Sequence, residues 1–354
     1  MERNHMNGTQ KPRTDNEKYI ELIKRLPEFT HNYFYYGASN KAILTRLSYA
    51  RDILYFFEYA VNNYEYFPEK TVKELTIDDI RQITPLDIDR FLSWMDDQNL
   101  SEKTRARRKT SVSVLYNYLI NTEQKLEFNP VSGAQKVEVS QSEFVIYLNR
   151  SEQEQLLNCI QSGAGLTPRQ LMYHEKYKKR DLAIVFLFLD TGLRISELHS
   201  LNVRDVVIFE DSMHPENNEC YVVTLRKGHK KAKTPSKVFF SDEAREYIRD
   251  YLESRELAGE KFTDNTPLFT TIDGDRLSIR EIQQMLKKYV KASIGRSDIS
   301  VHKLRSSFAM EFYKAQHNIL VLQQRMGHKS MTATNIYARA SEKEDEVRNS
   351  RNWR

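Results

Sequence analysis

Apolar residues recur every three or four positions in the first part of the chain, which is the spacing of one face of a helix. Residues 16–26 and 40–62 show this pattern most clearly. In these two segments the positions predicted to be buried are Tyr19, Ile20, Ile23, Leu26, Ile43, Leu47, Ala50, Leu54 and Phe57. Each segment is therefore predicted to be an amphipathic helix.

Two later segments carry signals for a helix start. Thr84 suits an N-cap, with Pro85 at the first helical position, and Ser101 begins the segment after it. The positions predicted to be buried in these helices are Leu86, Ile88, Phe91, Leu92, Met95, Val112, Leu115, Tyr116 and Leu119. No long alternating run interrupts this part of the sequence. We predict a compact bundle of four or five helices over residues 14–128, after a polar tail at residues 1–13.

A polar stretch rich in turn-forming residues follows at 129–148 and is predicted to be an interdomain linker. A new helix begins after it, with Ser151 as the predicted N-cap and Glu154 three residues later, which is a capping-box pattern. We assign residues 149–340 to a second domain. Residues 341–354 form a C-terminal tail with few apolar side chains.

The second domain mixes helices with a few strands. The strongly apolar segment 176–192 predicts a helix that ends at Gly192, and a short helix follows at 195–201. Residues 220–240 predict two strands around a basic turn, and most of 241–340 is predicted to be helical. The expected fold is mainly α with a small antiparallel β-sheet in the second domain, an α+β class.

The composition is that of an ordinary globular protein. Of 354 residues, 40% are hydrophobic and 29% are charged, and no stretch approaches the roughly 18 apolar residues that a membrane span requires. The polar N-terminus lacks the apolar core of a signal peptide. Cys159 and Cys220 show no paired spacing, which indicates a reducing compartment. We expect a cytoplasmic protein with no membrane partner.

Positive charge is clustered, although the net charge of +5 is mild and does not by itself indicate a nucleic-acid partner. The start of the helix after Ser101 carries Lys103, Arg105, Arg107, Arg108 and Lys109. Cations in the first turns of a helix oppose its dipole, so this placement costs stability unless an anion is near. Two interpretations remain open, a solvated helix face or a helix end laid against phosphates. A second, weaker candidate surface comprises Lys41, Thr45, Arg46, Tyr49 and Arg51.

The second domain also contains a candidate site for chemistry on a phosphodiester. Its members are Arg194, His302, Arg305, His328 and Tyr337. Arginine forks make permanently charged, bidentate bonds to phosphate oxygens, and histidine transfers protons near neutral pH. Tyrosine can form a covalent phosphotyrosine. Such a site needs no metal or other cofactor, and the sequence has no zinc-ligand spacing and no phosphate-binding glycine loop.

The basic turn between the two predicted strands supplies a candidate general acid. A lysine in such a turn could protonate a leaving oxygen, and both Lys227 and Lys230 are candidates. Lys230 and Lys231 are also candidate DNA contacts because they add positive charge to this turn.

Each site residue also has a purely structural interpretation. Tyr337 is one of 20 tyrosines, and most tyrosines pack in cores. Arg194 could cap the helix beside it, and a lone histidine is often a satisfied core residue. We interpret Glu197 as a support that hydrogen-bonds near Arg194, not as a base. Only the fixed spacings favour catalysis.

These spacings resemble those of the tyrosine recombinases, a family that includes Xer proteins and phage or transposon integrases. His302-Lys303-Leu304-Arg305 matches the family's HxxR box, "MGHKS" with His328 its LGH box, and Tyr337 lies in "TNIYA" at the expected distance. Arg194 in "TGLRISEL" is similar to the first arginine box. The resemblance covers roughly residues 150–340.

The resemblance implies a fold and a mechanism. A helical N-terminal domain and a catalytic domain would form a C-shaped clamp on DNA. Tyr337 would attack a DNA phosphate to give a 3′-phosphotyrosyl link, while Arg194, Arg305 and His328 hold the phosphate oxygens. Lys227 would protonate the 5′-oxygen and His302 would assist Tyr337.

The resemblance further implies four protomers on two duplexes, an inverted-repeat site and a Holliday junction. Two interpretations of the C-terminal tail remain open, a helix that docks on a neighbouring protomer or a solvated, frayed end. Alternatives are a type IB topoisomerase-like enzyme and a DNA-binding protein that has lost catalysis. The target sequence stays open. So does the choice between chromosome dimer resolution and integration or excision of a mobile element.

Overall fold

The computed structural model describes residues 14–140, 144–210, 213, 218–225, 235–328 and 330–352. The chain divides into two compact units, Met1–Gln141 and Ser142–Arg354, each with a hydrophobic core of its own. Within the described residues, no helix combines the length and the apolar character needed to cross a membrane.

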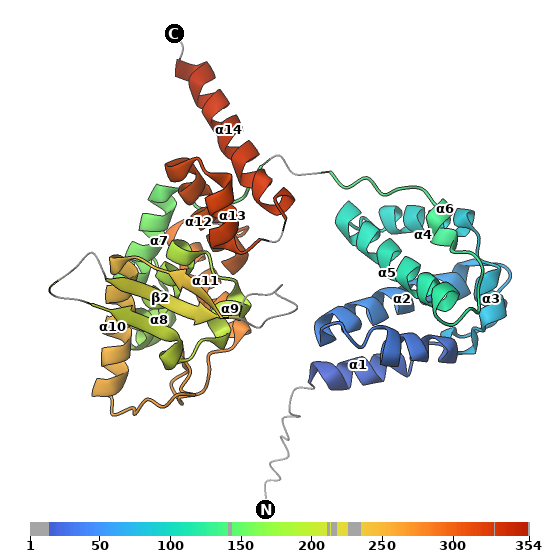
Figure 1. The fold of residues 1–354 in the computed structure, drawn as a ribbon, viewed down its shortest axis with the longest axis horizontal. Coiled ribbons are helices and arrows are strands. Elements are labelled where there is room, and N and C mark those ends of the chain that lie inside the picture. The colour runs from blue at the N-terminus through green and yellow to red at the C-terminus, as the bar shows by residue number, and fades with distance from the viewer. Residues whose placement is uncertain are drawn as a thin grey trace, which may run out of the picture. The chain divides into compact units, whose positions relative to one another are not determined.

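The first unit is a helical bundle (Figure 1). Its helices are α1 (Asp15–Ile23), α2 (Ile43–Asn63), α3 (Ile77–Arg81), α4 (Pro85–Asp97), α5 (Glu102–Asn121) and α6 (Pro130–Gly133). Short 3₁₀ or π turns lie at Glu28–Thr30, Tyr33–Gly37 and Val72–Glu74. Thr84 caps α4 with Pro85 at its first position, and Ser101 caps α5, as predicted.

Most of the predicted buried positions of this bundle are confirmed, with two errors. Phe57, Phe91 and Leu119 are among the fully buried core residues. Ile20 is 41% exposed and Leu86 59% exposed, so both face solvent. Each lies at the edge of its helix's apolar stripe, where spacing alone does not decide which side chain the neighbouring helix covers.

The stretch 129–148 contributes to both units. Pro130 and Val131 of α6 are buried against the first unit, and the Asn129 side chain caps α6. At the other end of the stretch, Leu148 is fully buried in the second unit, where its main-chain N–H donates to Ser307 Oγ at 2.8 Å.

The second unit combines helices with one small sheet (Figure 1). Its helices are α7 (Arg150–Ser162), α8 (Pro168–Thr191), α9 (Ile195–Ser200), α10 (Asp242–Leu257), α11 (Ile279–Ser293), α12 (Val301–Gln316), α13 (Ile319–Met326) and α14 (Thr332–Asn352), with a 3₁₀ turn at Val203–Asp205. Its strands are β1 (Val206–Phe209), β2 (Glu219–Thr224) and β3 (Ser236–Phe239).

The sheet has the order β1-β2-β3 and both pairs are antiparallel. Val222 at its centre is opposite Val206 on one side and Val238 on the other. The predicted class, mainly α with a small antiparallel sheet, is confirmed. Strand β1 was not predicted, because four apolar residues form a strand only when a partner is available.

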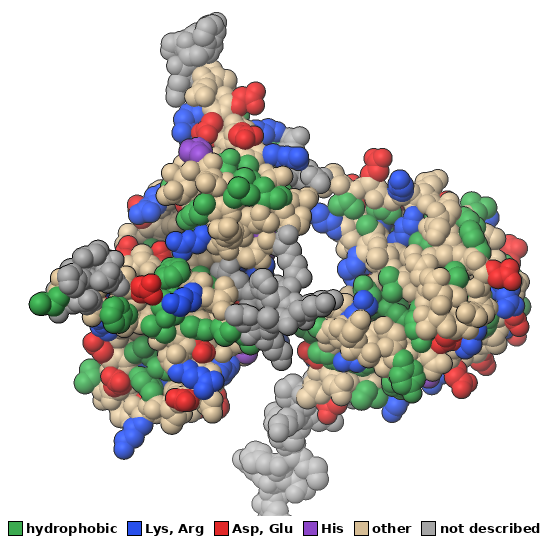
Figure 2. Space-filling model, viewed as in Figure 1, with side chains coloured by type: hydrophobic (Ala, Val, Ile, Leu, Met, Phe, Trp, Pro, Cys, Tyr) green, Lys and Arg blue, Asp and Glu red, His purple; other side chains and the backbone are tan. Residues whose placement is uncertain are grey.

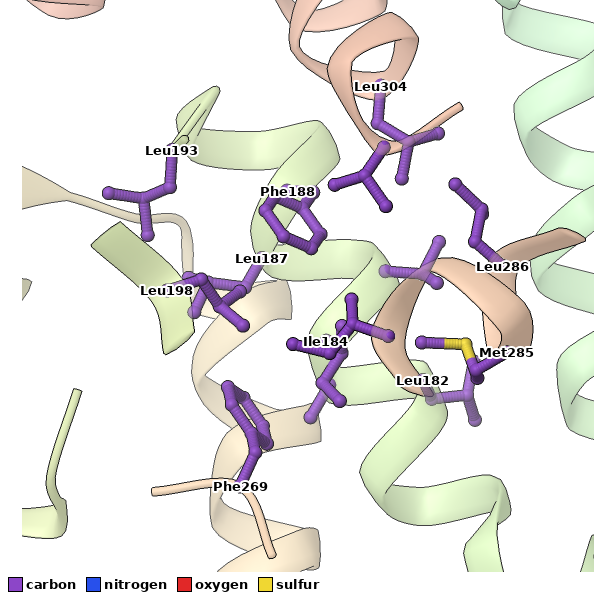
Figure 3. Packing of buried hydrophobic residues seen from close by; sticks show 14 of the residues in the cluster. Leu182, Ile184, Leu187, Phe188, Leu193, Leu198, Phe269, Met285, Leu286 and Leu304 are labelled. Carbon is purple, nitrogen blue, oxygen red and sulfur yellow. The ribbon is translucent and has the colours of Figure 1, made fainter. Parts of the chain in front are cut away.

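Helix α8 is the centre of the second unit. It packs against α7, α10 and α12, and the close view in Figure 3 shows Leu187 and Phe188 among the side chains of this core. Burial explains why its second half, Leu182–Phe188, is an almost continuous apolar run. The helix ends at Gly192, as predicted, but begins eight residues earlier than expected, at Pro168 with Thr167 as its N-cap.

One predicted helix start is wrong. Helix α7 is capped by Asn149, which forms a capping box with Glu152, so the cap is not Ser151. The sequence offers two overlapping capping boxes two residues apart. The buried side chain of the preceding residue, Leu148, decides between them by fixing where the chain enters the core.

Candidate active site

The turn between α8 and α9 positions Arg194. Gly192 closes α8 in the left-handed conformation, at φ +62°, and Arg194 becomes the N-cap residue of α9. The Arg194 guanidinium donates to Glu197 Oε1 at 2.8 Å, and its main-chain N–H donates to Glu197 Oε2 at 2.9 Å. Glu197 is only 3% exposed. The predicted supporting role of Glu197 is confirmed by these two bonds.

Arg305 is held at the meeting point of two helix ends. Its side chain, on α12, is 2% exposed and donates to the carbonyls of Gly192 and Met326. The Arg194 guanidinium also lies at the end of α13, since its Nη2 is 3.4 Å from the carbonyl oxygen of Gly327, the residue after Met326. The last carbonyls of a helix carry partial negative charge, so the ends of α8 and α13 attract both guanidinium groups.

The glycine at the end of α8 is required by space as well as by backbone conformation. A Cβ atom on Gly192 would lie 2.4 Å from Cδ1 of Phe308, on α12. The missing side chain therefore lets α12, which carries Arg305, approach the turn that presents Arg194.

His302 lies one helical turn before Arg305 on the same face of α12. Partial burial lowers the pKa of its imidazole below the ordinary 6.5, and the positive charges of Arg305, Lys303 and Arg194 lower this pKa further. The imidazole is therefore neutral at neutral pH and can accept a proton.

His328 directly follows the left-handed Gly327 that ends α13. Its Nδ1 lies 3.0 Å from Oγ1 of Thr334, a fully buried threonine on α14. Its main-chain N–H donates to the carbonyl of Gln323 at 3.1 Å. The imidazole thereby joins the end of α13 to the start of α14. Sequence reasoning did not single out Thr334, since a small polar residue in a helix gives no pattern of its own.

Tyr337 lies on α14 and is 3% exposed. It packs in a small apolar cluster with Phe308, Ala309, Met310, Leu322, Met326 and Ala340. Burial raises the pKa of its phenol, while a hydrogen bond with Ser306 and the charge of Arg305 lower it. The phenol therefore lies within the field of Arg305 yet is covered from solvent. The sequence motifs did not indicate Ser306, which follows Arg305 on α12 and contacts Tyr337 in the structure.

A polar network outside this cluster fixes α14 to the rest of the unit. The hydroxyl of Tyr147 accepts from Lys314 Nζ at 2.8 Å and donates to Glu344 Oε1 at 2.9 Å. Lys314 and Glu344 also form an ion pair at 2.7 Å. Helix α14 runs without a break across the boundary predicted at residue 340.

The predicted basic turn lies outside the described residues, and with it Lys227, Lys230 and Lys231. The strands that flank the turn are described. Thr224 at the end of β2 is opposite Ser236 at the start of β3, so the turn connects two neighbouring strands of the sheet.

The basic start of α5 has acceptors within its own unit. Arg105 pairs with Asp96 at 3.1 Å, and Lys109 donates to the carbonyl of Ala134 at 3.1 Å. Arg107 and Arg108 both contact Asp52 of α2, and Lys103 is exposed. On the face shown in Figure 2, lysine and arginine side chains are interspersed with acidic ones on both units.

Comparison with known proteins identifies the family. Residues 147–344, more than half of the chain, match the phage integrase family, and residues 32–123 match its N-terminal SAM-like domain. The chain belongs to the phage integrase family. Tyrosine recombinase XerC of Caldanaerobacter subterraneus is 28% identical over 330 residues, which covers 90% of this chain and 84% of that protein. This member of the phage integrase family is therefore a tyrosine site-specific recombinase.

Solved structures of recombinases share the fold. XerH recombinase bound to a palindromic difH substrate, in a post-cleavage complex, matches with a TM-score of 0.70 and 19% identity, over 95% of this chain and 89% of that one. The Tn1549 transposon integrase in complex with circular intermediate DNA matches with a TM-score of 0.59 and 21% identity, over 92% and 95%.

Proposed function

We propose that Tyr337 is the nucleophile of this phage integrase family member. Its phenolic oxygen attacks a DNA phosphorus, the bond from phosphorus to the 5′-oxygen breaks, and a 3′-phosphotyrosyl link forms. The observation that carries the proposal is the pair of arginines at the ends of α8 and α13, with Arg305 acting on both Tyr337 and His302. Two fixed guanidinium groups suit the oxygens of a pentacovalent phosphate.

The other residues complete the proton balance. His302, neutral because of its lowered pKa, takes the phenolic proton of Tyr337 as the bond to phosphorus forms. Lys227 supplies a proton to the departing 5′-oxygen, with Lys230 as the alternative. His328 joins Arg194 and Arg305 in holding the phosphate oxygens. The 5′-hydroxyl of a second duplex then attacks the link and gives its proton to Lys227, while the bond from phosphorus to Tyr337 breaks and the phenol regains its proton from His302. The phosphodiester energy is conserved, so the cycle uses no external energy.

We infer that double-stranded DNA with an inverted-repeat site is the substrate and that four protomers act on two duplexes through a Holliday junction, in the cytoplasm. The XerH structure that shares this fold is bound to a palindromic substrate, which supports a symmetric site. The two units would clamp the duplex. Lys103, Arg105, Arg107, Arg108 and Lys109 would place the start of α5 near phosphates, with Lys230 and Lys231 adding contacts from the basic turn.

A nicked duplex that loses a short fragment after cleavage tests the nucleophile, because the covalent complex cannot then be resealed. Wild-type protein should accumulate as a DNA-linked species that resists denaturing gel electrophoresis. Tyr337→Phe should bind the duplex with unchanged affinity and form no link. Tyr313→Phe, which changes a partly buried tyrosine packed against the same cluster, is the matched control and should still form the link. Trapping of the Tyr337→Phe protein would refute the assignment.

A further inference from the structure

A hollow of about 420 Å³ lies between α1, α2 and α5 of the first unit. Four arginines line it, Arg25, Arg51, Arg107 and Arg108, against only two carboxylates, Asp52 and Glu58. Arg25 and Glu58 neutralise each other at 2.9 Å. Three arginines, Arg51, Arg107 and Arg108, then remain in the hollow with one carboxylate, Asp52, so the hollow keeps an excess of positive charge.

That carboxylate, Asp52, lies at the buried side of the hollow. It is 2% exposed and accepts hydrogen bonds from Arg107 Nη1 and, at 2.8 Å, from the buried hydroxyl of Ser111. Arg108 Nε lies 3.8 Å away. A buried carboxylate is stable only with such partners, so Asp52 fixes the positions of two neighbouring guanidinium groups on α5.

The two guanidinium groups keep unused hydrogen-bonding capacity. Arg107 uses Nη1 for Ser48 Oγ, at 2.7 Å, and for Asp52, and its side chain is still 46% exposed. Arg108 stacks over the Tyr55 ring at 3.5 Å, and its Nη1 meets the weakly accepting sulfur of Met95. Its buried Nε has no hydrogen bond to any residue that the structure describes. Charge and stacking thus hold both groups in place while donors remain free.

The ligand that suits this arrangement is a tetrahedral oxyanion. Arginine forks bind phosphate oxygens with two parallel bonds, and the adjacent Arg51 adds a third charge that is not bonded to any described residue. Ser48, at the same rim, provides a hydroxyl that can donate to the same anion.

We propose that this hollow binds a backbone phosphate of the DNA and that Asp52 is a positioning residue, whose buried carboxylate aims Arg107 and Arg108 at that phosphate. The inference rests on the proposed function, in which duplex DNA is the substrate and the start of α5 faces it. Beyond that function, the inference assigns a role to an acidic residue, Asp52, whose removal is expected to weaken DNA binding.

The sign of that effect provides the test. Asp52→Asn removes a negative charge near DNA, so bulk electrostatics alone would tighten binding. Positioning predicts the reverse, about tenfold weaker binding, as expected for the loss of one charge-assisted contact. The slope of log affinity against log salt should also become shallower by about 0.9, the value of one phosphate contact. Binding is measured by fluorescence anisotropy with a labelled duplex of random sequence, using the full chain.

Glu58→Gln is the matched control, because it removes the same charge from the same hollow while Arg107 and Arg108 keep their partner. It should leave the affinity unchanged or raise it slightly. If Asp52→Asn does not fold by circular dichroism, Ser48→Ala replaces it. That variant removes the second acceptor of Arg107 together with a hydroxyl that can itself donate to the anion, and it should weaken binding about threefold; a folded Ser48→Ala variant of unchanged affinity would overturn the proposal.

The outcomes separate this inference from the proposed function. Wild-type protein that binds no duplex would refute the DNA substrate itself. Wild-type protein that binds DNA, together with a folded Asp52→Asn variant of equal or higher affinity, would overturn the positioning role alone.

Discussion

The contact between Gly192 and Phe308 predicts a large effect from a single added methyl group. Gly192→Ala places a Cβ in the left-handed region, which costs about 1–2 kcal/mol for an L-residue. The same Cβ would lie 2.4 Å from Cδ1 of Phe308, whereas carbon atoms in contact are normally about 3.5–4.0 Å apart. The ring must therefore move by about 1 Å, and such overpacking costs about 1–3 kcal/mol. We expect the free energy of unfolding to fall by about 2–5 kcal/mol.

Gly295→Ala separates the two contributions. Gly295 also follows a helix end and has a similar φ of +69°, and no atom of the part of the chain that the structure describes lies within 4 Å of its added Cβ. It should therefore cost only the conformational part, about 1–2 kcal/mol. Urea denaturation of both variants measures the difference, which is assigned to Phe308. Equal destabilisation of the two variants would refute the argument that Gly192 is required by packing against α12.

The same substitution should impair cleavage beyond its effect on stability. The Gly192 carbonyl is an acceptor of Arg305, so a shift of the turn against α12 changes the orientation of that guanidinium. A displacement of about 1 Å in such a group reduces a rate about a hundredfold. Formation of the DNA-linked species should therefore fall by that factor at a temperature where Gly192→Ala is folded, with DNA affinity unchanged. Full cleavage by the folded variant would contradict this reasoning.

Two other predictions concern titration and helix α14. The lowered pKa of His302 should appear in an NMR titration as a midpoint below 6.5. Because the unfolded chain binds this proton more readily than the folded protein does, the contribution of His302 to stability falls as the pH drops from about 6.5 through the folded pKa. A midpoint at or above 6.5 would contradict this. Tyr147→Phe removes the hydroxyl that links Lys314 to Glu344 and should lower the free energy of unfolding by about 1–3 kcal/mol in urea, whereas Tyr173→Phe, at a half-exposed position, should change it little.

Local features such as helix caps were predicted from the sequence more accurately than the packing of side chains was. Caps at Thr84 and Ser101 and the end of α8 at Gly192 depend on a few neighbouring residues, so motifs suffice to find them. The start of α8 at Pro168 was missed although Thr167 and Pro168 are ordinary start signals, because the segment after them is polar and the strong apolar run lies further on.

The candidate site shows the same division. Spacing in the sequence picked out Arg194, Arg305 and Tyr337, but it could not indicate the burial of Tyr337 or the carbonyl partners of the arginines. Nor could it place Asp52 beside the start of α5, since 55 residues separate it from Arg107. Such partners follow from how helices pack, which depends on contacts between distant parts of the chain.

The acceptors that orient the two arginines are main-chain carbonyls at Gly192, Met326 and Gly327. No side chain encodes them; they depend on two glycines that turn the chain at φ +62° and +59°. A designer who grafted only the reactive side chains onto another scaffold would leave both guanidinium groups unanchored. A graft of this site must therefore include both glycine turns as well as the reactive side chains, because the carbonyls of these turns orient the two arginines.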